Sequence, residues 1–383
     1  TMVTAGIFMV ARCSPLFNLS PTALSFVLVI GATTALFMGF LGMIQNDIKR
    51  IVAYSTLSQL GYMTVALGVA AYPIAIFHLM THAFFKALLF LGAGSVIIGM
   101  HHDQDIRNMG GLRKYMPITW ITFLIGTLAL VGTPFFSGFY SKEHIIEAAA
   151  NANVWGATFA RYATLIGVFV TSLYSFRVYF LVFHGKERFA TEDAHHGHDC
   201  GHDHAHDHAH AHAHDDHGHD DHHGGVPHES PWVVTLPLVL LAIPSIIIGA
   251  LVVKPLLFGD YFKNTIFNAP SHPAMAVLKS HFHDWVSYAL HAFSTVPFWL
   301  VVAGAVVAWY CYLINPKVPA AIQRKLSGLN YVLENKYFFD WFNEQVLARG
   351  ARCLGKGLWQ QGDRGLIDGL LVNGSARVVG DVD

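Results

Sequence analysis

Residues 75–90 read AIFHLMTHAFFKALLF, and this stretch decides the fold and points to the chemistry. It lies within an apolar run at residues 74–99, which exceeds the ~20 residues that a helix needs to cross a bilayer. His78, His82 and Lys86 stand four residues apart, so a helix places them on one face, one turn above another. A charged side chain in hydrocarbon costs about 2.5–3.5 kcal/mol, so we expect this stripe to face a cavity inside a helix bundle.

The stripe is suited to carrying protons, because histidine exchanges them near neutral pH and a buried lysine releases its proton more readily than one in water. Two other interpretations remain open. The histidines can be satisfied by backbone carbonyls or by hydrogen bonds across helices. His78 and His82 also have the spacing of two metal ligands, although no glutamate lies between them as in HExxH.

The composition supports a membrane protein. Of 383 residues, 53% are hydrophobic and 13% are charged, whereas a soluble protein has about a quarter of its residues charged. Apolar segments, most of them near spanning length, occur at residues 22–44, 51–70, 74–99, 117–149, 157–183, 231–253 and 296–314. The predicted fold class is all-α, a polytopic transmembrane helix bundle.

Composition also excludes several partners and sites. The net charge of −1 implies no nucleic-acid partner. The four cysteines are scattered without a CxxC pair, which predicts neither a disulfide framework nor an iron–sulfur cluster. No phosphate loop, Rossmann fingerprint or nucleophile motif is present, so we expect no redox or cofactor site in this chain. Thr1 opens within an apolar stretch and Asp383 closes a helical pattern, so we expect a fragment of a longer protein.

One apolar segment is interrupted. Residues 117–149 are too long for one straight span, and a Gly-Thr-Pro sequence ending at Pro134 lies near their middle. Proline removes a backbone donor and clashes with the preceding turn, so we predict a discontinuous helix whose second half carries Lys142 and Glu143. We interpret Lys142 as a second proton-carrying lysine that Glu143 influences. An interfacial pair that caps the half-helix is the alternative.

Positive charges gather on one side when the spans are threaded alternately, and this side is expected to be cytoplasmic. It holds Lys49, Arg50, Arg107, Arg113, Lys114, Lys186, Arg188, Lys317, Arg324 and Lys325. The other side holds Arg12, Arg161, Lys254, Lys263 and Lys279.

Residues 190–228 have a different composition, dense in histidine between His195 and His223 and mixed with Asp, Gly and Ala. Such a sequence cannot form a packed core, so we expect a disordered cytoplasmic loop. Histidine at this density binds zinc, nickel or copper weakly, but no ordered four-ligand spacing stands out. Metal buffering and a variable insertion without a function both remain open, and no other metal site is predicted.

The last part of the chain has a different pattern of apolar and polar residues. In residues 320–380 apolar positions recur three and four apart, which predicts a long C-terminal amphipathic lateral helix along a surface. A short soluble tail domain is the alternative. We therefore divide the chain into a transmembrane bundle (1–189), the His/Asp-rich loop (190–228), further transmembrane helices (229–315) and a truncated lateral-helix region (316–383).

Residues 47–62 (DIKRIVAYSTLSQLGY) and 77–90 (FHLMTHAFFKALLF) resemble the antiporter-like membrane subunits of proton-pumping NADH–quinone oxidoreductase. Residues 109–112 (MGGL) and 138–143 (GFYSKE) match as well, so the resemblance covers nearly the whole chain outside the His-rich loop. The long tail, with residues 185–187 (GKE) and 357–359 (GLW), is similar to the subunit L (chain 5) branch of the family.

The resemblance implies a half-channel built on broken helices related by an inverted repeat, with the second repeat in residues 1–189 and the first before Thr1. Lys86 is then similar to the central lysine of the proton pathway, and Lys142 to the terminal lysine on the broken helix. His78 and His82 are similar to its bridging histidines.

Three further residues are expected to support the pathway. Glu143 adjoins Lys142, and Asp47 occupies an acidic position of the family. Ser58 lies on a span whose hydroxyls are candidates to line the cavity, although serine within membranes more often joins helices.

The expected function is a proton-translocating membrane subunit of NADH:quinone oxidoreductase in the bacterial inner membrane. NADH, FMN, iron–sulfur clusters and quinone are expected in partner subunits. The expected contacts are other membrane and peripheral subunits, above all neighbouring antiporter-like subunits, and the lipid bilayer. A stand-alone cation/proton antiporter subunit of the same superfamily is the alternative, and a divalent-metal transporter fed by residues 195–223 is a third interpretation.

Overall fold

The computed structural model describes residues 2–189, 226–267 and 274–381. The predicted His-rich loop lies outside the described residues, except for its last three positions. The described part of the chain is helical and contains no β-strand. Its contacts divide it into two units, Thr1–Ala321 and Ile322–Asp383.

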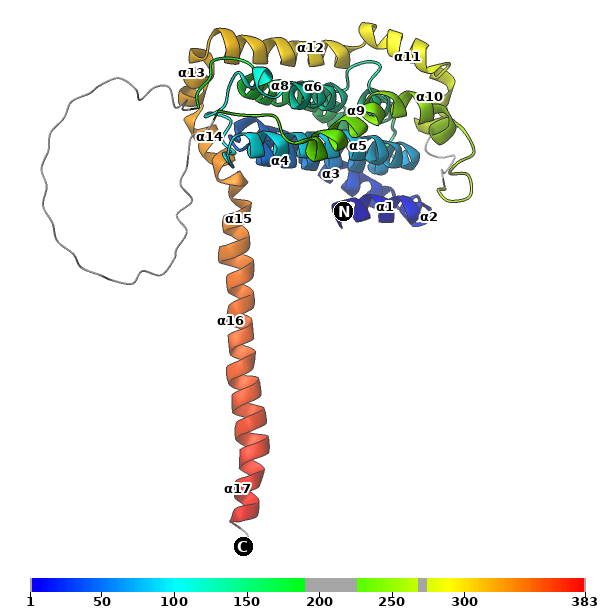
Figure 1. The fold of residues 1–383 in the computed structure, drawn as a ribbon. Helices are drawn as coiled ribbons and strands as arrows, with labels where there is room; N and C mark the ends of the chain where they lie inside the picture. Colours follow the sequence, from blue (N-terminus) through cyan, green and yellow to red (C-terminus); the bar gives the residue numbers. More distant parts are fainter. Residues whose placement is uncertain (1, 190–225, 268–273, 382–383) are drawn as a thin grey trace, which may run out of the picture. The chain divides into compact units, whose positions relative to one another are not determined.

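The first unit is a bundle of helices (Figure 1). In chain order these are α1 (Met2–Arg12), α2 (Ser14–Phe17), α3 (Pro21–Ile44), α4 (Ile48–Gly68), α5 (Tyr72–Gly99), α6 (Pro117–Val131), α7 (Ser137–Ala150), α8 (Ala157–Phe183), α9 (Trp232–Val253), α10 (Ala274–His281), α11 (Trp285–His291) and α12 (Val296–Trp309). In the described residues five helical segments are long and apolar enough to cross a membrane: Pro21–Ile44, Tyr72–Gly99, Ala157–Phe183, Trp232–Phe258 and Val296–Ile314. The predicted all-α class with several spans is therefore confirmed.

The exposed sides of these helices, which point away from the bundle, are apolar. On α9, for example, Leu236, Leu240 and Leu251 are exposed, whereas the buried positions include Ser245 and Gly249. In a protein folded in water this distribution would be inverted. The exposed apolar side chains therefore indicate that the bundle is surrounded by the hydrocarbon of a bilayer.

Helices α3 and α4 pack with their backbones close together. A Cβ atom added to Gly61 of α4 would lie 2.4 Å from the backbone nitrogen of Ala35 in α3, and one added to Gly68 would lie 2.5 Å from that of Leu28. Small residues at such an interface allow the close van der Waals contact that joins helices in a membrane.

The predicted break in residues 117–149 is present, which confirms the discontinuous helix. Helix α6 ends at Val131 with Gly132 in the left-handed conformation at its C-cap, and α7 begins at Ser137. The two halves stay in contact, because Gly138 lies so close to Ala129 that a Cβ atom would be 1.9 Å from its carbonyl oxygen. Only glycine fits this position.

The loops gather at two opposite ends of the bundle. We call the first end the basic face; here residues 45–50, 101–116 and 184–189 meet through backbone hydrogen bonds and through the ion pair of Lys114 with Glu187. At the other end, the outer face, Arg12 donates to the backbone of Thr265 and His281 pairs with Glu147. The short helices α10 and α11 lie at this outer face and were not expected from the sequence.

The second unit is described by itself. Its α-helices are α14 (Ser327–Glu334), α15 (Phe339–Phe342), α16 (Arg349–Gly357) and α17 (Ser375–Gly380). A π-helical stretch at Asn343–Ala348 joins α15 to α16, and another at Leu358–Gly374 joins α16 to α17. Helix α13 (Lys317–Lys325) crosses the boundary between the units. The helix is interrupted at Lys336–Phe338, where three successive residues have positive φ.

Replacing Gly61 by leucine is expected to destabilise the bundle, because the new side chain must push α3 and α4 apart. Overpacking of this kind costs about 1–3 kcal/mol. The midpoint of thermal unfolding in detergent would measure the effect. Gly94→Leu on α5 is the matched control, because an added Cβ atom there meets nothing within 4 Å. An unfolding midpoint for Gly61→Leu equal to that of the control would contradict the prediction.

Candidate functional site

The His/Lys stripe, defined as His78, His82 and Lys86, is buried inside the bundle. These side chains are 0%, 5% and 4% exposed, and they lie on α5, which packs against α4, α6, α7 and α9. The rings of His78 and His82 are 6.1 Å apart between centroids. The stripe thus faces protein.

His78 connects α5 to the two helices beside it. Its Nδ1 lies 2.7 Å from the hydroxyl of Ser141 on α7, and its Nε2 lies 3.2 Å from Oε1 of Gln59 on α4. With this orientation of the amide, Nε2 donates to Gln59 and Nδ1 accepts from Ser141. Ser141 also lies 2.8 Å from the hydroxyl of Thr81, so it joins two residues of α5.

Lys86 is held by α4. Its amine donates to the carbonyl of Val52, at 3.1 Å, and to the hydroxyl of Ser55. No carboxylate in the described part of the chain forms an ion pair with it. A buried ammonium with only neutral partners is poorly compensated, which favours exchange of its proton.

The side chain of Lys142 on α7 reaches back to the break between α6 and α7. It is 2% exposed, its amine donates to the carbonyl of Leu130 at 3.5 Å, and it lies 5.0 Å from the centre of the Tyr62 ring. In an unbroken helix the carbonyl of Leu130 would bind the N–H of residue 134, but Pro134 has none. The break therefore supplies the acceptor that holds the lysine.

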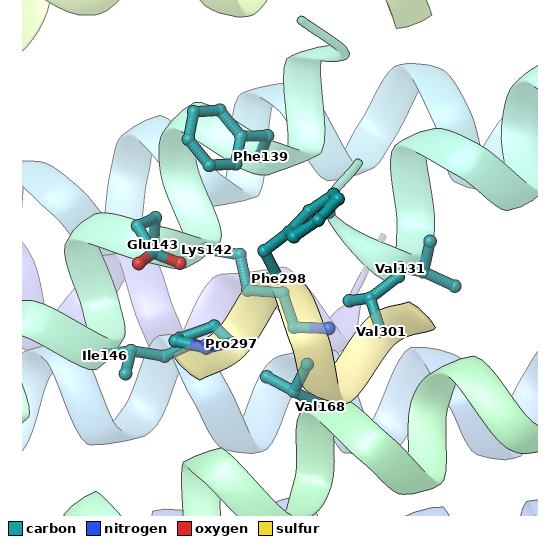
Figure 2. A pocket seen from close by; sticks show the side chains of 10 residues that line it. Val131, Phe139, Lys142, Glu143, Ile146, Val168, Pro297, Phe298 and Val301 are labelled. Atoms are coloured by element: carbon teal, nitrogen blue, oxygen red, sulfur yellow. The ribbon is translucent and has the colours of Figure 1, made fainter. Parts of the chain in front are cut away.

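Lys142 and Glu143 line one small cavity with apolar residues of α6, α8 and α12 (Figure 2). The volume of this cavity is about 10 Å³, close to the minimum for one water molecule. The carboxyl group of Glu143 contacts the side chain of Thr295, just before α12. The amine of Lys142 and the carboxyl group of Glu143 thus share a site in which water is scarce.

The stripe and the broken helix form one electrostatic group. Lys142 lies near enough to interact with both Lys86 and His78, and Lys86 interacts with His82. Like charges repel strongly where little water screens them, so a proton on one lysine disfavours a proton on the other. The described residues offer no hydrogen-bond partner to Nε2 of His82 or to Nε2 of Gln59, and buried groups of this kind normally bind water.

Two residues expected to support the pathway have other contacts. Ser58 donates to the carbonyl of Ala35 at 2.7 Å and so joins α4 to α3. Asp47 is the N-cap of α4, where its carboxylate accepts from the backbone N–H of Arg50 at 2.9 Å. Neither is hydrogen-bonded to the stripe in the structure described.

Ser141 and Thr81 complete the link from His78 to α7 and were not among the site residues predicted from the sequence. Both stand next to predicted residues, since Ser141 precedes Lys142 and Thr81 precedes His82. Nothing local reveals the link, because 63 residues separate His78 from Ser141 along the chain. Among the described residues no group of three or more His, Cys, Asp or Glu side chains is arranged to hold a metal ion. The histidines between 195 and 223 lie outside the described residues, so metal binding there stays a prediction.

Comparison with known proteins identifies relatives of the chain. Residues 1–167 match the family model described as NADH:quinone oxidoreductase/Mrp antiporter, TM. The NADH-quinone oxidoreductase subunit L of Neisseria meningitidis serogroup A is 55% identical over 100% of this chain and 55% of that protein. The subunit L of Rhodobacter capsulatus is 39% identical, over 98% of this chain and 57% of that protein. The chain spans about half the length of the curated relatives it matches.

A solved structure, that of the Mrp complex from Dietzia sp. DQ12-45-1b, shares the fold. It aligns with a TM-score of 0.56 and 21% identity, over 100% of this chain and 36% of that chain. Together with the apolar helices and the bacterial relatives, the matches indicate a multi-pass protein of the bacterial inner membrane. The resemblance noted in the sequence is thus confirmed: residues 1–167 match the NADH:quinone oxidoreductase/Mrp antiporter family model, and the chain is similar along its whole length to subunit L of bacterial NADH-quinone oxidoreductases.

Proposed function

We propose that this chain is a proton-translocating subunit of a NADH:quinone oxidoreductase, and that protons pass between Lys86 and Lys142 through His82 and His78. One observation carries the proposal. Three titratable side chains at one-turn spacing on α5 are buried, and His78 is hydrogen-bonded through Ser141 to the half-helix that carries Lys142.

The transfer follows from the chemistry of the side chains. A proton released by the amine of Lys86 is taken by His82, and then by His78. The described structure has no hydrogen bond between the two rings, and both nitrogens of His78 have other partners, so the two histidines exchange it through a bridging water. The hydroxyl of Ser141 donates to Nδ1 when His78 is neutral and accepts from Nδ1 when the ring takes up the proton, and this brings the proton to α7 and Lys142.

Repulsion between the two lysines couples their protonation. Charging Lys86 makes a second charge at Lys142 unfavourable, so a change of charge in a neighbouring subunit can move the proton from one site to the other. The redox reaction takes place elsewhere in this proposal. NADH, FMN, iron–sulfur clusters and quinone belong to partner subunits, and neighbouring antiporter-like subunits transmit the electrostatic change.

A stand-alone cation/proton antiporter subunit is the second candidate, because the matching family model covers both oxidoreductase and Mrp antiporter members. The two are separated by purifying the full-length protein from its native membrane. Subunits with flavin and iron–sulfur centres in the same particle support the oxidoreductase, and their absence supports the antiporter.

Lys86→Met is expected to lower the ratio of protons pumped to electrons transferred in the reconstituted full-length complex. Methionine keeps the length of the side chain but carries no proton. Proton uptake into proteoliposomes and NADH oxidation would be measured together, with Lys49→Met, on the exposed start of α4, as the control. Pumping at the wild-type ratio in Lys86→Met would remove this lysine from the pathway.

Ser141→Ala is expected to reduce pumping and to destabilise the bundle by about 1–3 kcal/mol, since it leaves Nδ1 of His78 without a partner and removes one hydrogen bond of Thr81. Ser95→Ala is the matched control. Ser95 is also buried on α5 and hydrogen-bonded, to Thr119 and Ser230, but it lies away from the stripe. The proposal requires that only Ser141→Ala lowers the ratio of protons to electrons, even if both variants lose stability.

Asp47→Asn is expected to leave pumping unchanged, because asparagine also caps a helix and the structure gives the carboxylate a capping role. Asp47→Ala should lower the free energy of unfolding by about 0.5–2 kcal/mol, as loss of an N-cap does. Thermal unfolding and pumping of both variants check this. Loss of pumping in Asp47→Asn with normal stability would instead give the charge of Asp47 a part in the pathway.

A further inference from the structure

A second cluster of titratable groups continues from Lys142 to the outer face. It consists of Glu143, His144 and Glu147 on α7, together with His281 on α10 and Tyr288 on α11. Glu147 accepts a hydrogen bond from the hydroxyl of Tyr288 at 3.3 Å, and its other oxygen lies 2.8 Å from Nδ1 of His281. The cluster thus joins the broken helix to the segment that carries α10 and α11.

Exposure increases from Lys142 through Glu147 to His281. The side chain of Lys142 is buried, that of Glu147 is 24% exposed, and that of His281 is 58% exposed. Glu143 and Glu147 are four residues apart, so they lie on one face of α7 and interact electrostatically. The cluster therefore leads stepwise from the interior of the bundle to water.

Aromatic packing holds in place the segment that carries His281 and Tyr288. Tyr288 stacks on His144 at 4.6 Å between ring centres, and Phe282 stacks on Phe258 at 4.7 Å. The position of the segment thus does not depend on the pair of His281 with Glu147 alone, and a change at residue 281 is expected to leave the segment in place.

We infer that Glu147 and His281 form the outward release site for protons that reach Lys142, with His281 as the last protein group before water. This inference rests on the proposed function. A proton from the Lys142–Glu143 cavity converts the Glu147 carboxylate to the acid. Glu147 returns to the carboxylate by passing the proton to Nδ1 of His281, and the imidazolium loses the proton on Nε2 to water. No group is oxidised or reduced.

A glutamate followed by a histidine suits this order of proton transfer. A carboxylate at the buried end accepts a proton that lysine releases, and histidine exchanges protons between about pH 5 and 8. Asp284 at the N-cap of α11 and His283 also lie near His281, and the backbone carbonyl of His281 is within 3.1 Å of the His283 ring. Because the positive charges gather on the basic face, the release site faces away from the cytoplasm.

The test compares substitutions in the reconstituted full-length complex, with proton pumping, NADH oxidation and subunit content measured on the same preparations. Glu147→Gln should lose as much pumping as Lys86→Met. His281→Gln and His281→Lys should both reduce pumping. Lysine preserves a cation beside Glu147 but does not release its proton readily at neutral pH, so it separates proton release from a merely structural ion pair.

Two matched controls are available on the same face. Asp260→Asn changes an exposed carboxylate that pairs with Lys263, and His291→Lys changes an exposed histidine on α11. Both should pump at the wild-type ratio. Tyr288→Phe keeps the stacking on His144 and should change pumping less than Glu147→Gln does.

The outcomes separate the two proposals. If Lys86→Met loses pumping but Glu147→Gln and His281→Lys do not, the release site is overturned and the relay stands. If only His281→Lys pumps normally, the pair of His281 with Glu147 is structural and His281 is not the last proton carrier. If none of these variants loses pumping, the proposed function itself fails. Should Glu147→Gln not assemble, the two His281 variants still decide the question.

Discussion

The structure depends on one constraint: ionisable side chains lie in an apolar bundle whose outer surface faces lipid. A charge at that depth must find partners within the protein, because the hydrocarbon offers none. Lys86 finds a carbonyl and a hydroxyl of α4, and Lys142 finds a carbonyl and the face of an aromatic ring. These partners are neutral, so they hold each amine in place without fixing its charge.

The broken helix follows from the same constraint. A continuous helix would use every backbone carbonyl within itself and leave none for a lysine side chain. Pro134 cannot donate to Leu130, so the carbonyl of Leu130 becomes available where Lys142 needs it. Gly132 and Gly138 then make the break compatible with tight packing, since one adopts a left-handed conformation and the other lies against Ala129.

The two ends of the bundle differ in charge and in the elements that cover them. The basic face is tied together by backbone bonds and exposed ion pairs, and the outer face is covered by α10 and α11. The pKa of Asp105 at the basic face is lowered, chiefly by its hydrogen bonds to Arg107. The loop at this face is thus charged and hydrated, whereas the outer face closes over the α7 half-helix with aromatic rings.

Elements with a local cause can be predicted from the amino-acid sequence. The apolar segments, the break at Pro134 and the stripe at i, i+4 and i+8 on α5 follow from composition and spacing, and the resemblance to a family follows from short motifs. Only the tertiary structure decided which neutral groups meet the stripe, and that Ser58 and Asp47 serve α3 packing and helix capping. It also decided that His281 reaches Glu147. These contacts join residues far apart in the chain, 63 positions for His78 and Ser141 and 134 for Glu147 and His281, so no local pattern can encode them.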